Sequence, residues 1–153
     1  MSNSMKGMVA GFVATLVLSA LLLLKGSMNI APELNIIRLL VSLGSIQQVA
    51  AWMDHFIVGV VIWGLLFGAY DAVAERPGHW LKGIIFGLFA WLMMMVVFMP
   101  LAKAGLFGNR IGIMAPLVTL VYHLVYGVVL GTTYGLLTTW VPVKEEPKGS
   151  PQT

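Results

Sequence analysis

The chain has no cysteine among its 153 residues, and it has little charge. Without cysteine, disulfides, thiolate metal sites, iron–sulfur clusters, cysteine nucleophiles and cysteine lipidation are all excluded. Only 10% of the residues are charged, whereas soluble globular proteins carry about 25%. The nine lysines and arginines are spread along the chain in ones and twos, so no basic patch is predicted to bind nucleic acid. The class that remains is a membrane protein.

The sequence does contain long uncharged runs, and four of them are long enough to cross a bilayer. A hydrocarbon core of about 30 Å needs about 20 apolar residues of helix, and a backbone in lipid must form its hydrogen bonds internally. The predicted helices cover residues 7–24, 47–70, 83–102 and 117–141. The first run is too long for a signal peptide and has no A-x-A-like cleavage site after it, so we expect it to be retained. We predict an all-α integral membrane four-helix bundle, as a single transmembrane domain over residues 1–142.

Two segments outside these helices have their own patterns. Residues 33–43 place polar side chains on one stripe and apolar ones on another, which predicts an amphipathic helix on the outer membrane surface. Residues 143–153 have no apolar cluster, so we expect a disordered tail. Five lysines and arginines flank the helices on the side of the termini and four on the opposite side. This excess favours a multi-pass protein of the bacterial cytoplasmic (inner) membrane with both termini in the cytoplasm.

An internal repeat relates the two halves of the chain. The pattern K-G-x-x-x-G-x-x-A-x-L starts at Lys6 and again at Lys82, and H-x-x-x-G-V-V starts at His55 and again at His123. The bundle is therefore predicted to be two copies of one helical hairpin. Each copy has an even number of spans, so the copies have the same orientation and form a parallel repeat. This places the two histidines at equivalent depth, roughly 25 Å from the cytoplasmic interface and in the outer leaflet.

Glycines recur at four-residue spacing in all four predicted helices. In lipid, small residues at this spacing let helix backbones approach closely. We interpret eight of them as helix-packing residues, namely Gly7, Gly11, Gly64, Gly68, Gly83, Gly87, Gly131 and Gly135. A second hypothesis concerns Gly59 and Gly127, which lie one turn after His55 and His123. On the same faces as the histidines, these two glycines leave room for a flat cofactor.

The two intramembrane histidines are the candidate functional residues, because an ionisable group inside a span is costly. The structural interpretation is that each histidine hydrogen-bonds a neighbour such as Thr119 or Tyr126 and stabilises the bundle. The alternative is that His55 and His123, on diagonally placed helices, bind the two faces of a haem b iron. This layout is similar to cytochrome b bundles, which usually carry two histidines on each ligand helix where this chain has one. A role in proton relay or solute transport is the third hypothesis.

Neither a catalytic motif nor a metal site is predicted. The sequence has no H-E-x-x-H, G-x-S-x-G, Walker or Rossmann pattern. A catalytic zinc needs three protein ligands, and His79 is predicted on the wrong side of the membrane to join His55. The favoured function is therefore a non-enzymatic membrane component, which self-associates or is accessory to a larger membrane complex.

Several short phrases of the sequence resemble a known family. They are M-K-G-M-V-A-G from Met5, P-E-L from Pro32, H-F-x-x-G from His55, W-L-K-G from Trp80, M-P-L-A from Met99, M-A-P from Met114 and H-L-x-Y-G from His123. Over about residues 5–140 the chain resembles a bacterial family of small four-span integral membrane proteins of unknown function. The resemblance implies the fold and the membrane location. It implies no reaction and no catalytic residue.

Overall fold

The computed structural model describes residues 1–28, 35, 37–38, 41, 48–74 and 78–139. Within these ranges the regular elements are all helical, and four helices pack against one another. The predicted all-α four-helix bundle is therefore confirmed. The surface helix predicted over residues 33–43 falls largely outside the described residues, and the tail predicted over residues 143–153 falls wholly outside them.

Four long helical segments account for the predicted spans. The first is α1 (Asn3–Ser27), and the last is α7 (Met114–Thr139), which follows the short 3₁₀ helix η3 (Leu106–Gly108). The second runs without a break through α3 (Gln48–Phe56), the π-helical η1 (Ile57–Ile62) and α4 (Trp63–Val73). The third runs through α5 (His79–Met93), the π-helical η2 (Met94–Phe98) and α6 (Met99–Leu101). All four segments are long and apolar enough to cross a membrane.

The first and third helices begin before the uncharged runs that predicted them. The runs started after Lys6 and Lys82, whereas α1 starts at Asn3 and α5 at His79. A charged residue limits the apolar run but does not end a helix, because lysine is a good helix former. Both lysines therefore lie inside the first turns of their helices, a placement that matters for the polar groups described below.

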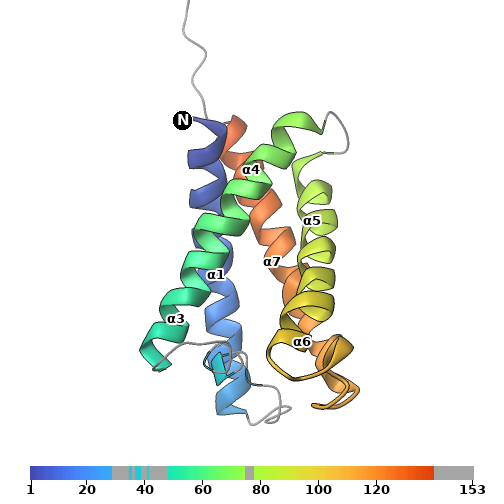
Figure 1. Cartoon of the computed structure of the whole chain (residues 1–153). Coiled ribbons are helices and arrows are strands. Elements are labelled where there is room, and N and C mark those ends of the chain that lie inside the picture. The colour runs from blue at the N-terminus through green and yellow to red at the C-terminus, as the bar shows by residue number, and fades with distance from the viewer. Residues whose placement is uncertain (29–34, 36, 39–40, 42–47, 75–77, 140–153) are drawn as a thin grey trace, which may run out of the picture.

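The bundle is closed at one end and open at the other. α1 packs against α4 and α7, and α5 packs against α7, so α1 with α5 and α4 with α7 are the diagonal pairs. α4 meets α5 in the half that holds the termini, where the Phe86 ring of α5 contacts Trp63 and Phe67 of α4. In the opposite half, α3 and α6 lie well apart (Figure 1).

Two cores follow from this shape. The larger core fills the half near the termini and contains residues from all four spans; its buried members are Ala10, Ala14, Phe67, Phe86, Tyr126, Leu130 and Tyr134. The smaller core joins only the third and fourth spans and the loop between them, through Met95, Met99, Ala104 and Ala115. Among the described residues the second span takes no part in the smaller core, and α3 packs against α1 and η1.

Glycines bring the two helices of each hairpin into backbone contact. A Cβ atom on Gly7 would overlap the Gly64 carbonyl, and one on Gly83 would overlap the Gly127 carbonyl. Of the eight predicted packing glycines, seven face the backbone of the neighbouring helix in this way, whereas Gly135 faces the His79 side chain. Helix backbones this close gain dispersion contacts that larger residues would prevent.

The two hairpins pack in a register that differs from the repeat in the sequence. The shared histidine phrase aligns Gly59 with Gly127, but in space Gly64 takes the place of Gly127, because Gly7 and Gly83 face these two residues. Gly64 is five positions after Gly59, whereas Gly131 is four positions after Gly127. The additional residue lies in η1, where a π turn takes up one more residue.

This shift changes the depth of the histidines. Gly11 of the first hairpin faces the Gly59 carbonyl, whereas its counterpart Gly87 faces the His123 carbonyl. His123 therefore lies at the level of Gly59, and His55 lies one turn, about 6 Å, farther from the termini. The prediction of equal depth is wrong by one helical turn.

Candidate functional site

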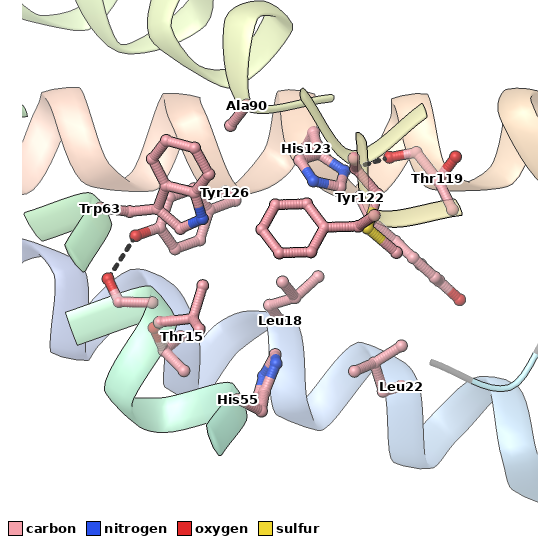
Figure 2. A pocket seen from close by; sticks show the side chains of 14 residues that line it. Thr15, Leu18, Leu22, His55, Trp63, Ala90, Thr119, Tyr122, His123 and Tyr126 are labelled. Carbon is pink, nitrogen blue, oxygen red and sulfur yellow. Dashed lines mark hydrogen bonds between the residues drawn. The ribbon is translucent and has the colours of Figure 1, made fainter. Parts of the chain in front are cut away.

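A cavity of about 120 Å³ lies in the open half of the bundle, and all four spans contribute to its wall. Both predicted histidines border it, His55 from α3 and His123 from α7. Most of the remaining lining is apolar and includes Leu18, Leu22 and Met94. Figure 2 shows the two imidazoles on opposite sides of this space, with Leu18 between them. The register shift therefore does not prevent the histidines from sharing one cavity.

Two threonine hydroxyl groups at the cavity wall are bonded to backbone carbonyls of their own helices. Thr15 donates to the Gly11 carbonyl at 2.7 Å, and Thr119 donates to the Ala115 carbonyl at 2.6 Å. Each of these bonds reaches back one turn along the same helix, which is the usual arrangement for threonine inside a span. Neither threonine hydroxyl therefore has a proton left to donate to a ligand.

Tyr126 forms a hydrogen bond between distant spans at the cavity wall. Its hydroxyl donates to the Gly59 carbonyl at 2.6 Å and so links α7 to the π turn of the diagonal span (Figure 2). Tyr126 was an expected partner of a histidine, but it bonds the backbone beside the cavity instead. Its side chain is buried, so this bond fixes the distance between the two diagonal helices.

His123 is held by its own helix. The Nδ1 atom lies 2.7 Å from the Thr119 carbonyl oxygen. A carbonyl only accepts hydrogen bonds, so Nδ1 carries the proton, and Nε2 of a neutral ring is an acceptor. His123 thus forms a hydrogen bond with Thr119, but the partner is the backbone oxygen of Thr119 and not its side chain.

His55 has a different environment. Its ring makes edge contacts with Trp52 and Phe56, with centroid separations of 5.7 and 5.8 Å. Its Nε2 atom is buried and has no hydrogen-bond partner among the residues that the structure describes. A buried polar atom in this state is uncommon and calls for an explanation. Nε2 of His55 is thus a group of the cavity wall that is available to bond a ligand.

The two glycines predicted to clear space for a cofactor lie in different places. Gly59 borders the cavity, and a Cβ atom there would meet the Thr15 side chain. Gly127 faces the Gly83 and Gly87 backbone on the far side of α7 and does not line the cavity. Of the four residues in the haem hypothesis, the cavity brings together His55, His123 and Gly59.

A second polar site lies at the closed end of the bundle, and sequence reasoning missed it. The buried Asp71 carboxylate accepts from the Lys82 ammonium at 3.1 Å and from His79 Nδ1 at 2.8 Å. The Lys82 ammonium also donates to the Asp71 backbone carbonyl at 3.1 Å. The available signal was the lysine that precedes the first glycine in both copies of the predicted repeat, since it recurs at the same place in the pattern.

Across the described ranges, no group of three or more His, Asp or Glu residues is arranged to hold a metal ion. The chemistry of the two sites is therefore that of hydrogen bonds, ion pairs and single histidine nitrogens. The cavity offers histidine nitrogens within an apolar wall, and the closed end offers buried charges.

Comparison with known proteins identifies the family of this chain but gives no activity. No curated protein and no solved structure matches the chain. A family model described as a family of unknown function (DUF6789) matches residues 1–143. Since this match extends over all four candidate membrane spans, the chain belongs to the DUF6789 family of unknown function.

Proposed function

We propose that this protein is a non-enzymatic membrane component that binds the polar head of a small apolar molecule in the cavity between His55 and His123. The observation that carries the proposal is the buried Nε2 atom of His55, which has no partner among the described residues. A ligand that bonds this atom removes the cost of leaving it unpaired, which is about 1–3 kcal/mol for a buried polar group.

The size of the cavity limits what fits inside it. Its volume of about 120 Å³ is close to that of an engineered apolar cavity of about 150 Å³ that binds benzene. One ring therefore fits, and a longer apolar tail would extend between the second and third spans, where α3 and α5 diverge. This opening faces lipid in a bundle that crosses a membrane, so the ligand would enter from the bilayer.

The chemistry of the wall favours binding over catalysis. Each threonine hydroxyl at the wall donates to a carbonyl of its own helix, and Tyr126 donates to Gly59. None of the three is paired with a histidine as an activated nucleophile would be. Neutral histidine nitrogens accept from a phenol or alcohol hydroxyl. The proposed ligand is therefore a ring-sized head with a hydroxyl group on an apolar tail.

Two probes that differ only in the hydroxyl test this proposal, 4-decylphenol and decylbenzene. Thermal unfolding of the purified protein in neutral detergent is measured with each probe. We expect 4-decylphenol to raise Tm by about 3 °C more than decylbenzene does, because only a ligand that binds the folded state stabilises it.

Two variants decide whether the effect belongs to the cavity. His55→Leu removes the unpartnered nitrogen and is expected to abolish the difference between the probes. Val121→Ala, at an exposed site of α7 outside the cavity, should leave the difference unchanged. An equal response to both probes in the unaltered protein, or an unchanged difference in His55→Leu, would contradict the proposal.

Haem b remains a second candidate, and one observation favours it. The Nδ1–H of His123 donates to a backbone carbonyl, as the ring of a metal-ligating histidine usually does, and so leaves Nε2 free to ligate. The cavity is smaller than the roughly 300 Å³ of typical cofactor sites, so α3 would have to move away from α5. Absorbance of protein expressed with added haem precursor tests this. A Soret band lost in both His55→Ala and His123→Ala would support haem, and a colourless folded protein would eliminate it.

We also propose that the protein lies in a bacterial cytoplasmic membrane with both termini in the cytoplasm. The excess of lysine and arginine on the side of the termini supports this orientation. Because the chain has no cysteine, single cysteines can be labelled without background. Val73→Cys and Ile113→Cys are exposed sites at opposite ends of the bundle. In intact cells an impermeant maleimide should label Cys at position 113 and spare position 73; the reverse result would invert the topology.

A further inference from the structure

Two lysines occupy matching buried positions at the closed end of the bundle. Lys6 precedes Gly7 in α1 and Lys82 precedes Gly83 in α5; the lysines are only 8% and 5% exposed. The positions match in space as well as in sequence, since Asn3 faces Gly68 as His79 faces Gly131. Each lysine also reaches across to the second helix of the other hairpin. A comparison of the groups around the two lysines therefore shows which charges have a partner.

The two ammonium groups have partners of different charge. Lys82 is neutralised by the Asp71 carboxylate at 3.1 Å. Lys6 donates to the neutral hydroxyl of Thr138 at 3.4 Å, and no carboxylate lies within 4.0 Å of it in the part of the chain that the structure describes. The charged side chains buried at this end, among the described residues, are two lysines and one aspartate, which leave one positive charge uncompensated. A buried ammonium is costly unless an anion neutralises it.

Position along the bundle indicates where such an anion comes from. Lys6 lies in the first turns of the first span, and Thr138 lies in the last turn of the fourth. These are the ends of two candidate membrane spans, so the pair lies near the depth of lipid headgroups. Two of the three ammonium protons have no acceptor in the described residues, which suits the several oxygens of a phosphate.

From the contrast with Lys82 we propose that Lys6, beside Thr138, binds the phosphate of an anionic phospholipid headgroup. The lipid then supplies to the first hairpin the negative charge that Asp71 supplies to the second. The cytoplasmic leaflet is the richer in anionic lipid, which agrees with the orientation proposed above.

Reconstitution in nanodiscs tests this proposal. Tm is measured in phosphatidylglycerol and in phosphatidylcholine, for the unaltered protein and for Lys6→Gln. We expect Tm of the unaltered protein to be higher in phosphatidylglycerol by about 2–4 °C, and we expect Lys6→Gln to lose this difference. Lys103→Gln, an exposed lysine at the other end of the bundle, is the matched control and should keep it. An equal lipid difference in Lys6→Gln would overturn the proposal.

Thr138→Asp makes the test sharper. It places a carboxylate beside Lys6, as Asp71 lies beside Lys82, and so should abolish the preference for phosphatidylglycerol while Lys6 is still present. A carboxylate near a helix C-terminus is itself unfavourable, but that cost is common to both lipids and cancels in the difference. Persistence of the full lipid preference in Thr138→Asp would contradict the proposal.

Two further arms separate the lipid from other anions. Glu145→Gln with Glu146→Gln removes the carboxylates of the C-terminal segment, and a loss of the lipid difference in this variant would assign the neutralising charge to that segment. Inorganic phosphate added to the protein in neutral detergent tests the free anion; an increase in Tm equal to that in phosphatidylglycerol would overturn the lipid as the source. We expect neither effect.

Discussion

The closed and open halves of this bundle differ in whether their buried polar groups have partners. In the closed half, Asp71 accepts from both Lys82 and His79, and aromatic rings from the second and third spans meet around Phe86. In the open half, the second span loses contact with the third, and the cavity wall contains a histidine nitrogen with no partner among the described residues. One end of the bundle is thus held by ion pairs and ring contacts, and the other contains the cavity in which we propose that a ligand binds.

The difference arises from the distance between the spans. Where four spans pack together, each buried charge can reach a partner on another helix, as Lys82 reaches Asp71. Where α3 and α5 separate, Thr15 and Tyr126 donate to backbone carbonyls of the same or a facing helix. Nε2 of His55 is buried there without a partner among the described residues, and it is the atom that we propose bonds a ligand.

The largest effect should come from removing the carboxylate of the closed half. Asp71→Leu leaves the Lys82 ammonium buried and unpaired, and we expect the free energy of unfolding to fall by about 3–5 kcal/mol. Adding Lys82→Met to this variant should recover most of the loss, since the unpaired charge is then gone. Denaturant titration in detergent measures both. A double variant as unstable as Asp71→Leu would show that the ion pair is not what matters.

A smaller but still large decrease in the free energy of unfolding is expected when the contact between α5 and α7 is widened. In Gly127→Ala the new Cβ would overlap the Gly83 carbonyl and lie 3.1 Å from the Gly87 Cα, so the two backbones must separate. We expect a loss of about 2–3 kcal/mol, as for overpacked cores. Gly26→Ala is the matched control, because that position has open space around it, and its stability should change little.

The bond that joins the two diagonal spans should contribute less. Tyr126→Phe removes the donor to the Gly59 carbonyl and keeps the ring, and we expect a loss of about 1 kcal/mol. The cavity should also widen, because this bond holds α7 near the π turn. A distance measured by electron paramagnetic resonance between spin labels at Val61 and Val121, both exposed, checks this second expectation; an unchanged distance would limit the bond to a local role.

The smallest effects should separate the two histidines in the absence of ligand. His55→Leu removes a buried nitrogen without a partner, so we expect the free energy of unfolding to stay constant or to rise by up to about 1 kcal/mol. His123→Leu loses the bond to the Thr119 carbonyl and should lower it by about 1 kcal/mol. Equal losses in the two variants would mean that His55 has a structural partner, which would weaken the binding proposal.

Much of the fold could be predicted because the bilayer constrains the sequence so strongly. Apolar runs bounded by Lys6, Lys25, Lys82 and Lys103 located the first and third helices to within a few residues of their observed ends. The pairing of small residues was readable for the same reason, since in lipid a recurring glycine has few uses other than close packing.

The candidate site was predicted only in part. The sequence singled out His55 and His123, and both border the cavity. It did not reveal their relative depth, because contacts between helices match Gly64, and not Gly59, with Gly127. Lys6 and Lys82 were predicted only as charges that flank the helices. A pattern of charge does not tell whether a side chain turns toward lipid headgroups or toward another helix.

The sequence by itself determined four membrane-spanning helices, their glycine faces and the histidines on two of them, because each of these follows from length, charge and spacing along one helix. Only the tertiary structure decided that the second and third spans meet at one end and diverge at the other, and that Lys82 finds a carboxylate while Lys6 finds a hydroxyl. The physical reason is that the cavity and the uncompensated charge depend on the distances between helices, which no segment encodes alone.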